Sequence, residues 1–164
     1  MSRRRVVVTG LGIISPVGNS IAAAWENILA GKSGIGPITN FDVSDFPVRI
    51  AGEIRDFDVS EYIPGKDARR MGAFIHYGIA AASQAIADAG LDITAANAAR
   101  AGVAIGSGIG GLHGIENAYQ AYVDGGPRKI SPFFVPGNII NMIGANLSIM
   151  YGTKEPNIAI VPAR

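Results

Sequence analysis

The most constraining feature of this sequence is an alternation of short strand-like runs with longer helix-like segments. Apolar, mainly β-branched runs predict strands at 5–10, 48–54, 102–105 and 157–161. Helical periodicity predicts helices at 21–29, 66–89, 115–123 and 139–151. Strands that alternate with helices favour a mostly parallel sheet covered on both faces, so we predict an α/β fold.

Start and stop signals bound two of these helices. Asn19-Ser20 can cap the helix at 21–29, and Gly31 ends it. Gly90 ends the helix at 66–89 in the same way. Alanines within this second helix would let neighbouring backbones approach closely, so we expect it to be buried on most sides.

Length, charge and cysteine content exclude several classes of protein. A chain of 164 residues can form one domain that buries about two-thirds of its unfolded surface. The formal net charge of +1 argues against a general nucleic-acid-binding protein. The absence of cysteine excludes disulfides, thiolate metal sites and a cysteine nucleophile within these residues. The apolar run at 6–10 is too short for a signal peptide and no run could span a bilayer, so we expect a soluble cytoplasmic protein without membrane contact.

A glycine-rich loop follows the strand predicted at 102–105. Residues 106–111 fit the dinucleotide fingerprint G-x-G-x-x-G, and such loops can hold phosphate. The fingerprint requires a following helix, a second strand and an acidic residue that binds ribose. Here the helix leads instead into the proline-rich loop after Asp124. A small nucleotide-binding domain therefore stays a minor alternative, to be tested by saturable binding of NAD or ATP.

Three basic residues have spacing that places them on one face of the helix predicted at 66–89. Lys66, Arg69 and Arg70 stand at i, i+3 and i+4. From spacing alone, we favour an ordinary solvated helix start over a surface that steers an acidic partner.

Two histidines and an aromatic pair have plain structural interpretations. His76 and His113 share no metal-ligand spacing, so we interpret them as a helix-surface and a loop histidine. We expect no metal and no cofactor. Phe133 and Phe134 lie between prolines in a loop, where core packing is the simplest interpretation.

One segment carries a specific resemblance. Residues 125–141, Gly-Gly-Pro-Arg-Lys-Ile-Ser-Pro-Phe-Phe-Val-Pro-Gly-Asn-Ile-Ile-Asn, closely resemble the β-ketoacyl-acyl-carrier-protein synthases, the condensing enzymes of type II fatty acid synthesis. The resemblance extends over residues 4–161. It implies a thiolase-like architecture of two similar halves, each with a mixed five-stranded sheet between helices. Residues 1–164 would supply most of the N-terminal half. The implied activity is that of an acyltransferase, a 3-oxoacyl-acyl-carrier-protein synthase of fatty acid biosynthesis.

The resemblance also implies site residues and partners. It assigns Ile109, Phe134 and Ile139 to the acyl pocket, with Ile139 reaching the pocket of a partner subunit in a homodimer. The patch Lys66, Arg69 and Arg70 would dock the acidic acyl carrier protein. The strand at 157–161 would pair with its two-fold mate.

The last residues depart from the family pattern. Pro162, Ala163 and Arg164 stand where the family has Thr-Ala-Cys, so Arg164 occupies the position of the nucleophile. Arginine stays protonated and cannot attack a thioester. We therefore expect a chain truncated at the nucleophile position and inactive alone, without the C-terminal half, its two catalytic histidines and its lysine. A companion C-terminal polypeptide could supply these groups. The alternative is a non-catalytic module for carrier-protein binding or dimerisation.

Overall fold

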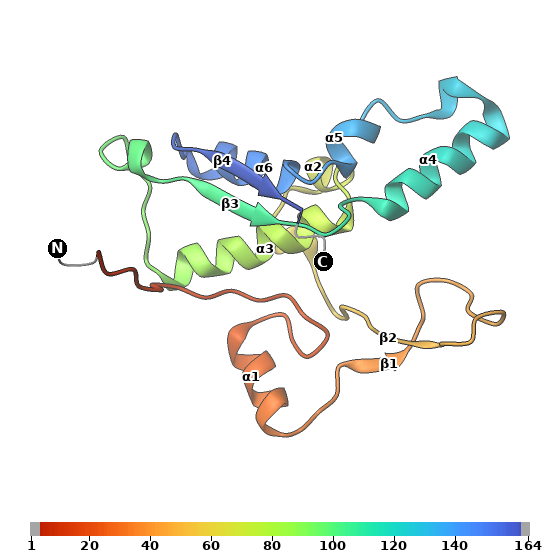
Figure 1. Cartoon of the computed structure of the whole chain (residues 1–164), viewed down its shortest axis with the longest axis horizontal. Helices are drawn as coiled ribbons and strands as arrows, with labels where there is room; N and C mark the ends of the chain where they lie inside the picture. The colour runs from red at the N-terminus through yellow and green to blue at the C-terminus, as the bar shows by residue number, and fades with distance from the viewer. Residues whose placement is uncertain (1–3, 162–164) are drawn as a thin grey trace. The chain divides into compact units, whose positions relative to one another are not determined.

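The computed structural model describes residues 4–161, which form helices and two small sheets (Figure 1). The helices are α1 Ile21–Leu29, α2 Gly65–Ala68, α3 Ala73–Asp88, α4 Leu112–Gly125, α5 Phe134–Asn138 and α6 Met142–Tyr151. The strands are β1 Ile35–Pro37, β2 Ile50–Gly52, β3 Val103–Gly106 and β4 Asn157–Ile160. The chain divides into two compact units, unit 1 with Met1–Asp58 and Ala80–Leu91, and unit 2 with Val59–Ile79 and Asp92–Arg164. Helix α3 thus contributes to both units.

Unit 1 contains α1 and the antiparallel pair β1–β2. The side chain of Ser20 accepts a hydrogen bond from the backbone N–H of Ala23, and Gly31 adopts a φ of 66° just after the helix. These features confirm the predicted start and stop of α1. In the pair β1–β2, Ile35 lies opposite Gly52, which confirms the strand predicted at 48–54.

The strand predicted at 5–10 is wrong, because this segment pairs with no other strand among residues 4–161. Side chains of α3 satisfy the backbone just after it instead. The N–H of Leu11 donates to Asp88 Oδ2 at 2.9 Å, and the N–H of Ile13 donates to Gln84 Oε1 at 3.1 Å. The apolar residues 6–8 stay exposed. An apolar β-branched run therefore lies in irregular chain without a sheet partner.

A buried carboxylate joins the segments that follow β1 and β2. Glu53 is only 8% exposed and accepts hydrogen bonds from the N–H and the hydroxyl of Thr39, the latter at 2.8 Å. The N–H of Asn40 donates to it as well, at 3.1 Å. These bonds, led by the Thr39 N–H, hold the pKa of Glu53 below its ordinary value, with a smaller contribution from the charge of Arg55. Its ionised form thus stabilises this end of unit 1.

We expect Glu53→Gln to destabilise the chain at neutral pH and to make little difference in acid. Because folding lowers the pKa of Glu53, its contribution is fully present above the unfolded value near 4.5 and is lost as the pH falls through the folded value. Urea unfolding between pH 7 and pH 3 should show the stability gap between wild type and variant closing below about pH 4.5. Asp45→Asn, at an exposed carboxylate, is the control. A gap that does not depend on pH would contradict this account.

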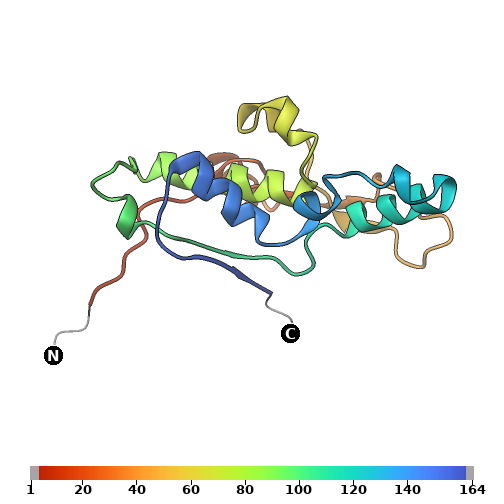
Figure 2. The same cartoon turned by 90° about the horizontal axis from the view of Figure 1, so that it is seen from above.

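Unit 2 is built on the parallel pair β3–β4. Val103 lies opposite Asn157, and Gly106 lies opposite Ile160. The chain between these strands passes through α4, α5 and α6, and α6 lies beside both strands (Figures 1 and 2). The strands predicted at 102–105 and 157–161 and their parallel arrangement are confirmed. Residues 4–161 form two two-stranded sheets, however, and not the five-stranded sheet that the resemblance implies.

One predicted helix is divided in two, and another begins later than predicted. The helix predicted at 66–89 separates into α2 and α3, because the N–H of Gly72 donates to the carbonyl of Gly137 at 2.9 Å instead of continuing α2. Its predicted end is confirmed, since Gly90 has a φ of 58°. The helix predicted at 139–151 begins only at Met142, because Ile139 is extended, with a ψ of 142°.

The core of unit 2 lies between α3 and α6. Ile75 and Ile79 of α3 are fully buried, and Ile143 and Leu147 of α6 are nearly so. A Cβ on Gly78 would lie 2.6 Å from Ile143, so the absence of a side chain there lets α6 approach α3 closely. The expectation that α3 is buried on most sides holds for this half of the helix. Among residues 4–161, no helix is both long and apolar enough to cross a membrane.

Candidate functional site

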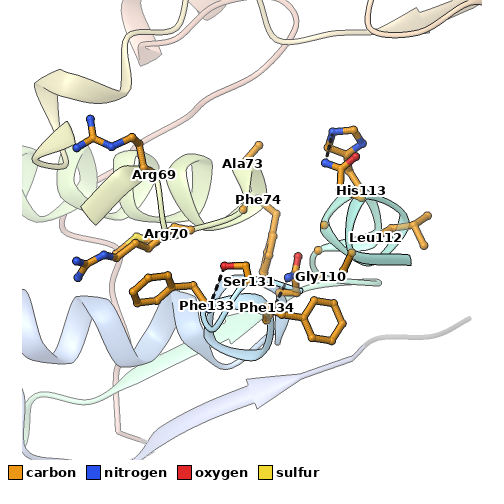
Figure 3. Close-up of a pocket in the computed structure, with 18 of the residues that line it drawn as sticks. Arg69, Arg70, Ala73, Phe74, Gly110, Leu112, His113, Ser131, Phe133 and Phe134 are labelled. Atoms are coloured by element: carbon orange, nitrogen blue, oxygen red, sulfur yellow. Dashed lines mark hydrogen bonds between the residues drawn. The ribbon is translucent and has the colours of Figure 1, made fainter. Parts of the chain in front are cut away.

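Unit 2 contains a cavity of about 530 Å³ between α4, the segment before α5, and the connection from α2 to α3 (Figure 3). Its aromatic lining residues are Phe74, Phe133 and Phe134. Its cationic lining residues are Arg69, Arg70 and Lys129, with His113 on α4. Most of the remaining lining consists of glycines and alanines. The cavity therefore combines an apolar wall with positive charge.

Two glycines bring the α2–α3 connection against α5. Besides the hydrogen bond from Gly72 to Gly137, a Cβ on Gly137 would lie 2.8 Å from the carbonyl oxygen of Arg70. A Cβ on Gly72 would lie 2.8 Å from the carbonyl oxygen of Gly137. Any side chain at either position would push apart the two segments that form this side of the cavity.

Asn138 joins α5 to the start of α4. Its carbonyl accepts a hydrogen bond from the N–H of Gly111 at 3.0 Å, and its Nδ2 donates to the carbonyl of Phe134 at 2.5 Å. Its Oδ1 lies against Gly111 and Gly114, where a Cβ would have no space. The carbonyl of Asn138 therefore occupies the N–H of Gly111. If residues 106–111 bound a dinucleotide, that N–H would be one of the donors to its phosphate. Sequence reasoning missed this residue, since nothing local distinguishes it from other loop asparagines.

The aromatic pair ends a tight turn that begins at Ser131, beside the cavity. The N–H of Phe133 donates to Ser131 Oγ at 3.1 Å, and the N–H of Phe134 donates to the carbonyl of Ser131 at 3.0 Å. The guanidinium carbon of Arg70 lies 4.6 Å from the centre of the Phe133 ring, a cation–π contact. Phe133 is 39% exposed and Phe134 is half-buried, so the pair lines the cavity and is not enclosed in a core.

The structure brings together only part of the predicted site. Phe134, Arg69 and Arg70 line the cavity. Ile109 is 68% exposed in the loop before α4, and Ile139 is 41% exposed just after α5. Neither of these isoleucines lines the cavity, and Lys66 does not line it either. Arg164 lies outside the described residues.

The single helix face predicted for the basic patch is wrong. Lys66 lies in α2, but that helix ends at Ala68, with Arg69 as its C-cap and Arg70 in the following turn. The three side chains are nevertheless all exposed. Proximity in sequence, and not helical periodicity, keeps them near one another.

The histidines have structural partners. His113 was predicted in a loop, but it lies in the first turn of α4, 3.7 Å from the carboxylate of Glu116. His76 Nε2 lies 2.9 Å from the carbonyl oxygen of Ala68, so an N–H on that nitrogen would satisfy the end of α2. Within residues 4–161, no group of three potential metal ligands comes together.

Comparison with known proteins identifies the family. The family model for the N-terminal domain of β-ketoacyl synthases matches residues 3–163. The chain belongs to the β-ketoacyl synthase family. It is 59% identical to a 3-oxoacyl-(acyl-carrier-protein) synthase 2 from Vibrio harveyi, over 99% of this chain and 39% of that protein. The chain thus spans about two-fifths of the length of this β-ketoacyl synthase relative.

Solved ketosynthase structures share the fold. The ishigamide ketosynthase/chain length factor superposes with a TM-score of 0.81 at 28% identity, over 98% of this chain and 40% of that one. A type II polyketide ketosynthase, solved with its acyl-carrier protein and bound to a hexaketide, superposes with a TM-score of 0.77 at 26% identity, over 96% of this chain and 41% of that one. The predicted thiolase-like α/β fold class is therefore confirmed.

Proposed function

We propose that this chain forms an acyl-binding and carrier-binding part of a 3-oxoacyl-acyl-carrier-protein synthase of fatty acid elongation. The observation that carries the proposal is the cavity of unit 2, where Phe134 lies near the exposed Arg69 and Arg70 in a β-ketoacyl synthase chain. Apolar walls suit an acyl chain, and exposed cations suit an acidic carrier protein. The activity named for the Vibrio harveyi relative supports the same reaction class.

The proposed reaction proceeds through a thioester. An acyl group passes from the carrier thiol to a cysteine thiol, and the carrier leaves as its free thiol. Malonyl-carrier then loses carbon dioxide, its carbanion attacks the thioester carbonyl, and the cysteine thiolate is expelled as the carbon–carbon bond forms. The 164 residues contain no cysteine, so we propose that this thiol belongs to other sequence, on the same or a companion polypeptide. Transfer of a radiolabelled acyl group onto the purified chain would contradict this.

Within this proposal, Ile109, Phe134 and Ile139 contact the acyl chain, with Ile139 turned toward a partner subunit. Lys66, Arg69 and Arg70 form the carrier-docking patch. All three cations are exposed, and within residues 4–161 neither Lys66 nor Arg69 has a side-chain partner. Their charges are therefore available to an acidic surface. The solved polyketide ketosynthase with its acyl-carrier protein supports this kind of partner.

Charge reversal tests the docking patch. We expect the double variant Lys66→Glu, Arg69→Glu to weaken binding of an acyl carrier protein by roughly tenfold or more at low salt, because each exposed charge contributes up to about 1 kcal/mol and reversal adds repulsion. The difference should shrink at high salt, where surface charges are screened. Fluorescence anisotropy with a labelled carrier protein measures it. Lys154→Glu, an exposed lysine of unit 2 away from the cavity, is the matched control. Equal losses in both variants would reject a localised docking patch.

We further propose that the chain forms a homodimer through β4. Among residues 4–161, β4 pairs only with β3, and Ile158 and Ile160 are 50% and 54% exposed. The remaining edge of β4 could therefore pair with a second copy. A monomer mass by light scattering at micromolar concentration would count against this arrangement.

A further inference from the structure

Two neighbouring arginines at the cavity have different surroundings. Arg69 has no side-chain partner within residues 4–161, whereas Arg70 stacks on Phe133 at 4.6 Å. Figure 3 shows their side chains leaving the chain in different directions, with Arg70 beside Phe133. Both arginines are exposed, so exposure alone does not explain the difference.

The contact of Arg70 suits its chemistry. A planar guanidinium is weakly hydrated and is attracted to the negative face of an aromatic ring. Phe133 stays 39% exposed with Arg70 over its ring, so this ring lies at the edge of the cavity, partly in contact with water. The stacked arginine covers part of that ring.

Phe133 in turn is the N-cap residue of α5. Its carbonyl accepts a hydrogen bond from the N–H of Gly137 at 2.8 Å, and the carbonyl of Gly137 accepts one from Gly72, which follows Arg70 closely in the sequence. Arg70 and Phe133 are therefore linked twice, by the ring contact and by this backbone path. Phe134, the next residue, places its own side chain in the cavity wall.

We infer that Arg70 is a positioning residue that holds Phe133 and thereby sets the place of Phe134 in the cavity wall, while Lys66 and Arg69 attract the carrier protein. The inference rests on the proposed function and divides the docking patch into two roles. Loss of Arg70 should then affect recognition of the acyl chain more than recognition of the carrier surface.

Binding of two carrier proteins separates these roles. Dissociation constants are measured for a carrier without its prosthetic arm and for the same carrier with a long saturated acyl chain. The first constant divided by the second is the ratio that reports how much the arm and the chain contribute to binding. Arg69→Glu should weaken the binding of both carriers by the same factor and leave the ratio unchanged. Arg70→Met and Phe133→Leu should each lower the ratio by about twofold to fivefold. The double variant should lower it no further than either change alone, and Arg70→Lys should restore part of it.

A second measurement needs no ligand. In the chain labelled with 4-fluorophenylalanine, the ¹⁹F resonances of positions 133 and 134 are assigned by Phe133→Leu and Phe134→Leu. Arg70→Met should shift both resonances, and Lys66→Glu, at a residue that does not line the cavity, should shift neither. The inference is overturned if Arg70→Met leaves the resonance of position 134 unchanged. It is also overturned if Arg70→Met weakens the binding of both carriers by the same factor, as Arg69→Glu is expected to do. If wild type binds neither carrier, the proposed function fails, while the ¹⁹F shifts still decide whether Arg70 positions the aromatic pair.

Discussion

Ile79→Ala is expected to lower the free energy of unfolding by about 2–4 kcal/mol, the cost of removing a fully buried isoleucine and leaving a cavity. Ile79 has no exposed surface and lies on the part of α3 that belongs to the core of unit 2. The higher helix propensity of alanine stabilises the variant by only about 0.5 kcal/mol. The loss of packing therefore decides the sign of the change in the free energy of unfolding.

Urea unfolding followed by circular dichroism measures the effect of Ile79→Ala. The midpoint should fall while the slope with denaturant stays the same, which indicates a change in stability and not in the unfolded state. Ile149→Ala is a matched control, since Ile149 lies in α6 of the same unit but is 80% exposed. We expect its effect to stay within about 0.5 kcal/mol. Similar losses in both variants would mean that α3 does not form the core described above.

Gly12→Val should destabilise the chain by about 3 kcal/mol, near the upper end of what inserted carbon atoms usually cost. A Cβ at Gly12 would overlap the carbonyl oxygen of Ala81 and would lie 2.8 Å from the nitrogen of Ala85. Both are backbone atoms of α3, which cannot rotate away as a side chain can. The segment would have to leave the helix, and the hydrogen bonds of its neighbours Leu11 and Ile13 to α3 side chains would be lost.

Gly108→Ala is the control for Gly12→Val. A Cβ at Gly108 would meet no atom within 4 Å, and this glycine lacks the positive φ that would strain a side chain. Thermal unfolding of both variants should therefore show a large fall in melting temperature for Gly12→Val and almost none for Gly108→Ala. An unchanged melting temperature for Gly12→Val would mean that residues near 12 do not rest on α3 in solution.

The resemblance predicted the family and part of the site, but not how the site is assembled. Phe134, Arg69 and Arg70 were expected to belong to two separate features, an acyl pocket and a docking patch, and they line one cavity. Asn138 was missed, although its carbonyl accepts a hydrogen bond from Gly111 at the start of α4 and its side chain lies against Gly111 and Gly114. Its role depends on glycines more than twenty residues earlier, and local sequence carries no information on that contact.

Local interactions were enough to predict elements whose boundaries depend on neighbouring residues. Ser20 and Gly31 bound α1, Gly90 follows α3, and β3 and β4 lie close to their predicted positions, because caps, glycine turns and β-branched runs act within a few residues. Contacts between distant segments decided the rest. The valine-rich run near the N-terminus formed no strand, because a strand needs a partner and its neighbouring backbone found α3 side chains instead. Likewise, the predicted helix at 66–89 divided at Gly72, because a carbonyl far along the chain, that of Gly137, accepts the hydrogen bond of its N–H.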